Sequence, residues 1–120
     1  PDMLHTYDRE LNGQAIEIAL AEGLSAYEGI YLGLPGPNLE TPAEYSFFHQ
    51  IGADVIGMST VPEVLVARHM GVPLLVVSVV SNKCFPIDEL QETTHEEVIK
   101  VVEQVTPKLQ RVMMRVLAEL

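Results

Sequence analysis

The sequence predicts an α/β fold, a layered mixed sheet that is partly parallel and flanked by helices, and three observations predict it. Segments with helical spacing alternate with short β-forming segments in the order α, β, α, β, α, β, α. The segment 73–81 is apolar and rich in valine, as in a strand that is covered on both faces. Three Thr-x-x-Glu patterns, which typically begin helices, follow the predicted strands directly or after a loop.

The first helix and strand are predicted within residues 11–33. Apolar side chains recur with helical spacing over residues 11–22, and Gly23 is suited to end that helix. Residues 28–33 are β-forming and are bounded by glycines, which is typical of a short strand. A turn rich in proline and glycine follows at residues 34–38.

The second helix is predicted from Pro42 to about Ile51. Thr41 can cap its first turn, Glu44 can bond back to the cap, and Pro42 suits the first helical position. Much of the local sequence therefore fixes the backbone around the residue just before this helix, Glu40.

A short buried strand is predicted over residues 53–58, followed by a third helix that runs to about Met70 and stops at Gly71. Thr60 and Glu63 form the second Thr-x-x-Glu pattern, and we expect a second capping box there.

The last strand and the last helix are predicted over residues 73–81 and from Thr94 to nearly Leu120. Thr94 and Glu97 form the third capping box pattern. Pro107 lies inside this helix and is expected to kink it, because proline lacks the amide hydrogen of the helical ladder.

Charge and length limit the classes of function. The chain has 7 basic and 17 acidic side chains, a net charge of −10, which disfavours binding of nucleic acid or of an anionic membrane surface. No apolar run approaches the ~20 residues of a membrane-spanning helix. The single Cys84 cannot form an internal disulfide, which favours a reducing, cytoplasmic location. Because the 120 residues begin at Pro1, we expect a piece of a larger protein.

Ligands of α/β folds bind outside the carboxyl ends of strands, where four polar side chains are predicted. Glu40 and His95 lie at helix starts, Ser59 at a strand-to-helix junction, and Asn82 at the end of the apolar strand. Each has a structural alternative: a carboxylate that stabilises a helix N-terminus, a solvated first-turn histidine, a plain helix cap, and a turn asparagine. Metal-ligand spacing is absent among His5, His49, His69 and Cys84, so no metal site is predicted.

Five motifs together carry a resemblance to a known family. These are PDMLHTYDR, GPNLETPAE, GADVIGMSTVPEVLVARHMG, SVVSNK and HEEV. In this order and spacing they resemble purine nucleoside phosphorylases of the trimeric type, and GMSTVPEVxxARHxG is the most specific of them. The resemblance implies that residues 1–120 are the C-terminal half of a nucleoside phosphorylase domain, with the N-terminal half in the same or in a separate chain.

The resemblance assigns the purine base to two loops. Glu40 would accept hydrogen bonds from N1–H and, in guanine, from the exocyclic amine, while Asn82 would engage O6 and N7. Ser81 stands next to Asn82 where the family usually has threonine. Leu39 replaces the family's usual phenylalanine, which packs on the base, so base affinity is expected to differ.

The resemblance assigns the sugar and the phosphate to other positions. Tyr31 and Met58 would line the ribose, and Ser59 would contact phosphate. His95 would hold the 5′-hydroxyl group, with Val98 packed beside the sugar.

The activity that the resemblance implies is phosphorolysis of inosine and guanosine to the free base and pentose 1-phosphate. Orthophosphate would be a co-substrate and the nucleophile, no cofactor or metal would be needed, and the assembly would be a homotrimer. Relatives that cleave methylthioadenosine have serine and aspartate at the positions of Glu40 and Asn82. A 5′-methylthioadenosine or methylthioinosine phosphorylase, and a non-catalytic purine-binding remnant, stay open as alternatives.

Overall fold

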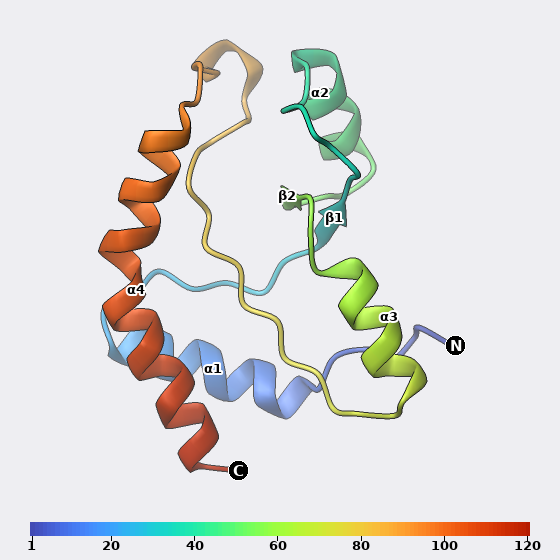
Figure 1. Cartoon of the computed structure of the whole chain (residues 1–120), viewed down its shortest axis with the longest axis vertical. Helices are drawn as coiled ribbons and strands as arrows, with labels where there is room; N and C mark the ends of the chain where they lie inside the picture. The colour runs from blue at the N-terminus through green and yellow to red at the C-terminus, as the bar shows by residue number, and fades with distance from the viewer.

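The computed structural model describes residues 1–120 and confirms the α/β class (Figure 1). Helices and strands alternate through most of the chain, as predicted. The elements are α1 (Arg9–Ala21), β1 (Tyr31–Gly33), α2 (Pro42–Gln50), β2 (Val55–Gly57), α3 (Val61–His69), the single-turn 3₁₀ helix η1 (Ile87–Glu89) and α4 (His95–Ala118).

The sheet consists of β1 and β2, which pair in parallel. Tyr31 lies opposite Val55 and Gly33 lies opposite Gly57. Side-chain support comes from Asp54, whose carboxylate accepts a hydrogen bond of 2.8 Å from the backbone N–H of Ile30. The parallel direction brings the carboxyl ends of both strands to one edge, where the loops toward α2 and α3 begin.

The predicted strand over residues 73–81 is wrong for this structure. The segment has no regular secondary structure, and it runs past the small sheet as an open trace (Figure 1). Its one backbone hydrogen bond to a distant residue joins the N–H of Asp8 to the carbonyl of Leu74, at 2.9 Å. Valine-rich sequence favours an extended backbone, but a strand also needs a hydrogen-bonded neighbour, and neither β1 nor β2 pairs with this segment.

Three of the four α-helices have an N-terminus that is capped by a side chain. The Thr41–Glu44 and Thr94–Glu97 capping boxes are confirmed, each with both reciprocal hydrogen bonds. At α1 an additional cap is present, because Asp8 accepts from the N–H groups of Glu10 and Leu11. The expected capping box at Thr60 and Glu63 is wrong, since the Thr60 side chain makes no cap hydrogen bond.

Glycines end the first three helices in the same way. Gly23, Gly52 and Gly71 have φ angles of +78°, +95° and +72°, which L side chains rarely adopt. In each case the glycine N–H and the next N–H bond back to carbonyls of the last helical turn, which is the Schellman arrangement. The stops predicted at Gly23 and Gly71 are therefore confirmed, and Gly52 ends α2.

The small core lies where α4 packs on α1 (Figure 1). Val112 is 1% exposed and is the most deeply buried large side chain of the chain. Its buried neighbours in this cluster are Ala15, Ile18, Ala19 and Val116. Helix α4 continues through Pro107 as one element, so the proline does not break it.

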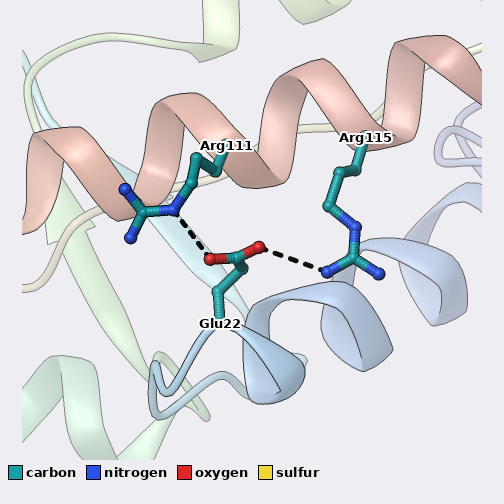
Figure 2. A network of polar contacts seen from close by, with 3 residues as sticks. All are labelled: Glu22, Arg111 and Arg115. Carbon is teal, nitrogen blue, oxygen red and sulfur yellow. Dashed lines mark hydrogen bonds and ion pairs between the residues drawn. The ribbon is translucent and has the colours of Figure 1, made fainter.

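Two ion pairs also join the end of α1 to α4 (Figure 2). The Glu22 carboxylate at the end of α1 accepts from Arg111 Nε at 2.8 Å and from Arg115 at 3.2 Å. The Arg111 hydrogen bond is the main reason that the pKa of Glu22 lies below its ordinary value. Desolvation opposes it, and the Arg115 hydrogen bond lowers the pKa further. Two guanidinium groups thus offset the unfavourable placing of a carboxylate at a helix C-terminus.

Much apolar surface lies outside this core. Only seven residues are buried, and large side chains such as Ile30, Val72 and Val80 are exposed. None of the helices has the length and apolar character that crossing a membrane requires.

Candidate functional site

A cleft of about 810 Å³ opens between α2, the β2–α3 junction and the segment that follows residue 76. The sheet supplies Tyr31 and residues 53–57, and the loop before α2 supplies Leu39 and Glu40. Residues 77–85 form the facing wall. The cleft therefore joins parts of the chain that are far apart in sequence, as expected for a site at the edge of a parallel sheet.

Most of the predicted site residues line this one cleft. The two expected base-contacting side chains, Glu40 and Asn82, come from different segments, the loop before α2 and residues 77–85. Both walls also contribute residues that were predicted to bind base, sugar or phosphate. These are Tyr31, Leu39, Ser59 and Ser81.

Three predicted site residues do not line the cleft. Met58 packs against Gly36, where an added Cβ would overlap its sulfur atom. His95 is the first residue of α4 and is exposed, and Val98 lies one turn further along the same helix. Helix α4 contributes Val112 and Val116 to the core with α1, far along the helix from this first turn, and no residue of the turn lines the cleft. The sugar-binding roles of these residues stay predictions.

The backbone next to Glu40 is held by the capping box of α2. Glu44 accepts from the backbone N–H of Thr41 at 3.0 Å and from its hydroxyl at 2.8 Å. These two hydrogen bonds, the backbone one first, hold the pKa of Glu44 below its ordinary value. Glu44 is thus a charged acceptor committed to the cap, whereas the half-buried Glu40 carboxylate is available in the cleft.

The amide of Asn82 is oriented by its neighbours. The Ser81 hydroxyl donates to Asn82 Oδ1 at 2.8 Å, and Asn82 Nδ2 donates to the sulfur of Cys84 at 3.2 Å. A primary amide has two N–H groups and two acceptor lone pairs. One donor and one acceptor position therefore remain for a ligand that presents both an acceptor and a donor.

The β2–α3 junction contains an unusual turn. Thr60 has φ +77° and ψ −54°, and the N–H of Val61 bonds to the carbonyl of Ser59 at 2.8 Å. This is a γ-turn with positive φ, a strained conformation for a β-branched residue. The turn brings the Thr60 hydroxyl to 3.1 Å from Ser59 Oγ. That geometry explains why Thr60 forms no capping box, and strain of this kind is typical of functional sites.

The Tyr31 hydroxyl reaches this turn from β1. It accepts from the N–H of Ser59 at 3.3 Å and lies 3.4 Å from Ser59 Oγ. Burial alone would raise the pKa of Tyr31, but the hydrogen bonds from Ser59 and Thr60 outweigh it and lower that pKa. A Cβ on Gly57 would overlap the Tyr31 hydroxyl, so glycine is required there for the tyrosine to reach Ser59.

Sequence reasoning missed several side chains of the cleft. Tyr45 and His49, one turn apart on α2, face the loop that carries Cys84 and Phe85. Their spacing on the predicted helix was visible in the sequence. The partner loop could not be identified, because its approach to α2 is a tertiary contact. Among all residues, no cluster of three or more potential metal-binding side chains is present.

Comparison with protein families matches residues 1–118 to the model described as "Phosphorylase superfamily". Two relatives illustrate the similarity. Purine nucleoside phosphorylase 1 of Bacillus subtilis is 43% identical over 105 residues, which are 88% of this chain and 38% of that protein. Purine nucleoside phosphorylase of Bos taurus is 40% identical over 114 residues, 92% of this chain and 39% of that protein.

Solved structures give the same result. Crystal structures of Schistosoma mansoni purine nucleoside phosphorylase with inosine and with adenosine each superpose with a TM-score of 0.91 at 34% identity. They match 100% of this chain and 44% of theirs. The chain thus spans about two fifths of the length of the relatives that it matches.

Proposed function

The chain belongs to the phosphorylase superfamily, and on that premise we propose that the intact protein cleaves inosine and guanosine by phosphorolysis. The products are the free purine base and a pentose 1-phosphate. One observation carries the proposal most strongly: Glu40 and Asn82, which are 42 residues apart in the sequence, line the same cleft.

The chemistry of these two side chains favours a 6-oxopurine. Such a base presents N1–H as a donor, which a carboxylate accepts, and O6 as an acceptor. O6 and N7 of such a nucleoside are both acceptors, so the remaining N–H of the Asn82 amide can donate to either of them. The remaining acceptor position of the amide can take the N7–H of the base after its release. A 6-aminopurine presents an unprotonated N1, which an ionised Glu40 would repel.

Phosphorolysis breaks the bond between C1′ of the sugar and N9 of the base, and an oxygen of phosphate bonds to C1′. The electron pair of the broken bond stays on the purine, so the base becomes anionic as the sugar becomes cationic. Asn82 would donate to the N7 edge and Glu40 would hold the N1 edge, so that preoriented groups stabilise the departing base.

The other end of the cleft suits phosphate. Ser59 and Thr60 place two hydroxyl groups 3.1 Å apart at the start of α3, close to the Tyr31 hydroxyl. Helix starts and hydroxyl groups favour anions. Orthophosphate is the proposed co-substrate and nucleophile, and the residues of this scheme use no cofactor or metal. We further propose a homotrimer, as the family resemblance implies.

The experiment is an assay of the intact protein for phosphate-dependent release of hypoxanthine from inosine. The expected result is release that requires phosphate and yields ribose 1-phosphate in equal amount. Cleavage of adenosine or methylthioadenosine with no action on inosine would overturn the assigned substrate class. Retained base binding with no cleavage of any nucleoside would instead support the non-catalytic alternative.

A second candidate is a 5′-methylthioinosine or methylthioadenosine phosphorylase. His95, which was expected to hold the 5′-hydroxyl group, lies outside the cleft. No polar side chain of the cleft is then assigned to the 5′ position of the sugar, and an apolar 5′-methylthio group fits such a position. Competition between inosine and 5′-methylthioinosine separates the two. A higher kcat/KM for inosine supports the first function, and a higher kcat/KM for the methylthio compound supports the second.

A further inference from the structure

Helix α2 docks on the loop that carries Asn82. His49 stacks on Phe85 with ring centroids 3.9 Å apart and an angle of 17° between the planes. One turn earlier, Tyr45 faces Cys84. Helix α2 also contacts η1, which follows this loop. The two expected base-contacting side chains therefore come from segments that pack directly against each other.

Tyr45 is the buried member of this contact. It is 7% exposed, and yet it lines the cleft together with Glu40 and Cys84. Burial raises the pKa of Tyr45 far above its ordinary value, and the neighbouring Cys84 thiol and Glu40 carboxylate raise it further. A tyrosine hydroxyl with its ordinary pKa is already protonated at neutral pH, so the Tyr45 hydroxyl can donate to either of these two neighbours.

Cys84 extends the contact to the other wall of the cleft. Its sulfur accepts from Asn82 Nδ2 at 3.2 Å, and Ser81 holds the opposite side of the same amide. A continuous series of polar neighbours thus runs from Glu40 through Tyr45 and Cys84 to Asn82. Both ends of the series are residues to which the proposed function gives contacts with the base.

We propose that Tyr45 is a positioning residue for purine recognition, whose hydroxyl donates to the Glu40 carboxylate and fixes its geometry relative to Asn82. The inference rests on the proposed function, because Tyr45 acts through the two base-contacting side chains. A carboxylate has about four lone-pair sites on its two oxygens, so one donor from Tyr45 leaves the others for the N1 edge of the base. If the Glu40 side chain is already fixed before binding, less conformational entropy is lost when the base binds.

The test is Tyr45→Phe in the intact protein, which removes one oxygen atom and keeps the buried ring. The matched control is Tyr27→Phe, since Tyr27 is 87% exposed and lies outside the cleft. Loss of a hydrogen bond to a charged group predicts a rise of roughly tenfold in the KM for inosine. The KM for phosphate should stay within about twofold of the wild-type value, because Ser59 and Thr60 are not part of the series. The control variant should match wild type in both.

An unchanged inosine KM in Tyr45→Phe would overturn the inference. So would equal rises in the KM values for inosine and phosphate, because that pattern indicates a general packing role. Thermal melting shows whether the variant is folded. If it is not folded, Cys84→Ala replaces it, because alanine has no acceptor for Asn82 Nδ2. An inosine KM like that of wild type in Cys84→Ala counts against the proposed link from Tyr45 through Cys84 to Asn82.

A second readout needs binding but no turnover. Because Cys84 contacts Asn82, bound hypoxanthine should slow alkylation of Cys84 by iodoacetamide in the intact protein, as measured by peptide mass spectrometry. Tyr45→Phe should weaken this protection by the same factor as the rise in inosine KM. Protection that Tyr45→Phe weakens, found without phosphorolysis, would overturn the proposed function and keep the inference. Phosphorolysis with no protection, or with protection that Tyr45→Phe leaves unchanged, would overturn the inference and keep the proposed function. Absence of both would overturn the two together.

Discussion

The replacement Glu40→Gln tests base recognition most sharply, because it keeps the size of the side chain and removes its charge. The carboxylate accepts hydrogen bonds through both oxygens, whereas the amide has one acceptor oxygen and a donor NH₂ group. Inosine presents one donor at this edge, N1–H, and guanosine presents two, N1–H and the 2-amino group. The two nucleosides should therefore respond differently to the same replacement.

The magnitude follows from the type of hydrogen bond. Bonds to charged groups contribute about 1.5–3 kcal/mol and neutral ones about 0.5–1.5 kcal/mol, so a single exchanged bond costs roughly 1–1.5 kcal/mol. That difference corresponds to a loss of about tenfold in kcat/KM for inosine. With guanosine, the glutamine NH₂ faces the 2-amino group, which is also a donor, so both groups lose a partner at a half-buried position. This adds roughly another tenfold loss in kcat/KM for guanosine.

The assay measures kcat/KM for both nucleosides at saturating phosphate, with release of hypoxanthine or guanine as the signal. The matched control is Glu17→Gln, which removes the same charge from an exposed position of α1. The ratio of guanosine to inosine should fall by about tenfold in Glu40→Gln and stay constant in the control. A constant ratio in Glu40→Gln would refute the reasoning, because it would mean that the carboxylate does not meet the N1 edge.

Three further replacements have defined outcomes. Asn82→Asp should raise the kcat/KM for adenosine relative to inosine, because a carboxylate accepts from a 6-amino group; an unaltered preference would count against the role of Asn82. Tyr31→Phe should raise the KM for phosphate by about three- to tenfold, since the N–H of Ser59 loses its acceptor. The KM for inosine should change less, because the replacement keeps the aromatic ring that is expected to line the ribose. Glu22→Gln should lower the melting temperature at pH 7. The pKa of Glu22 is lowered in the folded state, so its stabilisation is present above the ordinary value of 4.5 and is lost as the pH falls through the lowered pKa. The difference from wild type should accordingly shrink in acid, and a difference that is constant with pH would exclude the ion pairs with Arg111 and Arg115.

Local sequence signals predicted the helices well. The caps at Thr41 and Thr94 and the stops at Gly23 and Gly71 depend on contacts within a few residues, and all four are present. The same reasoning failed at Thr60, where the sequence pattern is as good but the backbone forms a strained γ-turn. The Thr60 hydroxyl contacts the adjacent Ser59 in place of the cap, and Ser59 is in turn contacted by the Tyr31 hydroxyl, which is a tertiary contact.

Features that depend on distant partners could not be predicted in the same way. The valine-rich residues 73–81 have strand character, yet pairing requires a neighbour that local sequence does not specify. The family motifs assigned Glu40 and Asn82 to one base-binding site. Both residues line the same cleft, and their contacts with a base stay predictions. Tyr45 belongs to no motif, and its place between these two residues follows only from the packing of α2 on the loop that contains Cys84.

A crystal structure of the intact protein with hypoxanthine and ribose 1-phosphate tests base recognition by Glu40 and Asn82 directly. We expect the base in the cleft, with the Glu40 carboxylate about 2.7–3.0 Å from N1 and the Asn82 amide within hydrogen-bond distance of O6 or N7. The Tyr45 hydroxyl should lie at a similar distance from the free side of the same carboxylate. A base bound elsewhere, or bound here with neither Glu40 nor Asn82 in contact, would contradict this expectation.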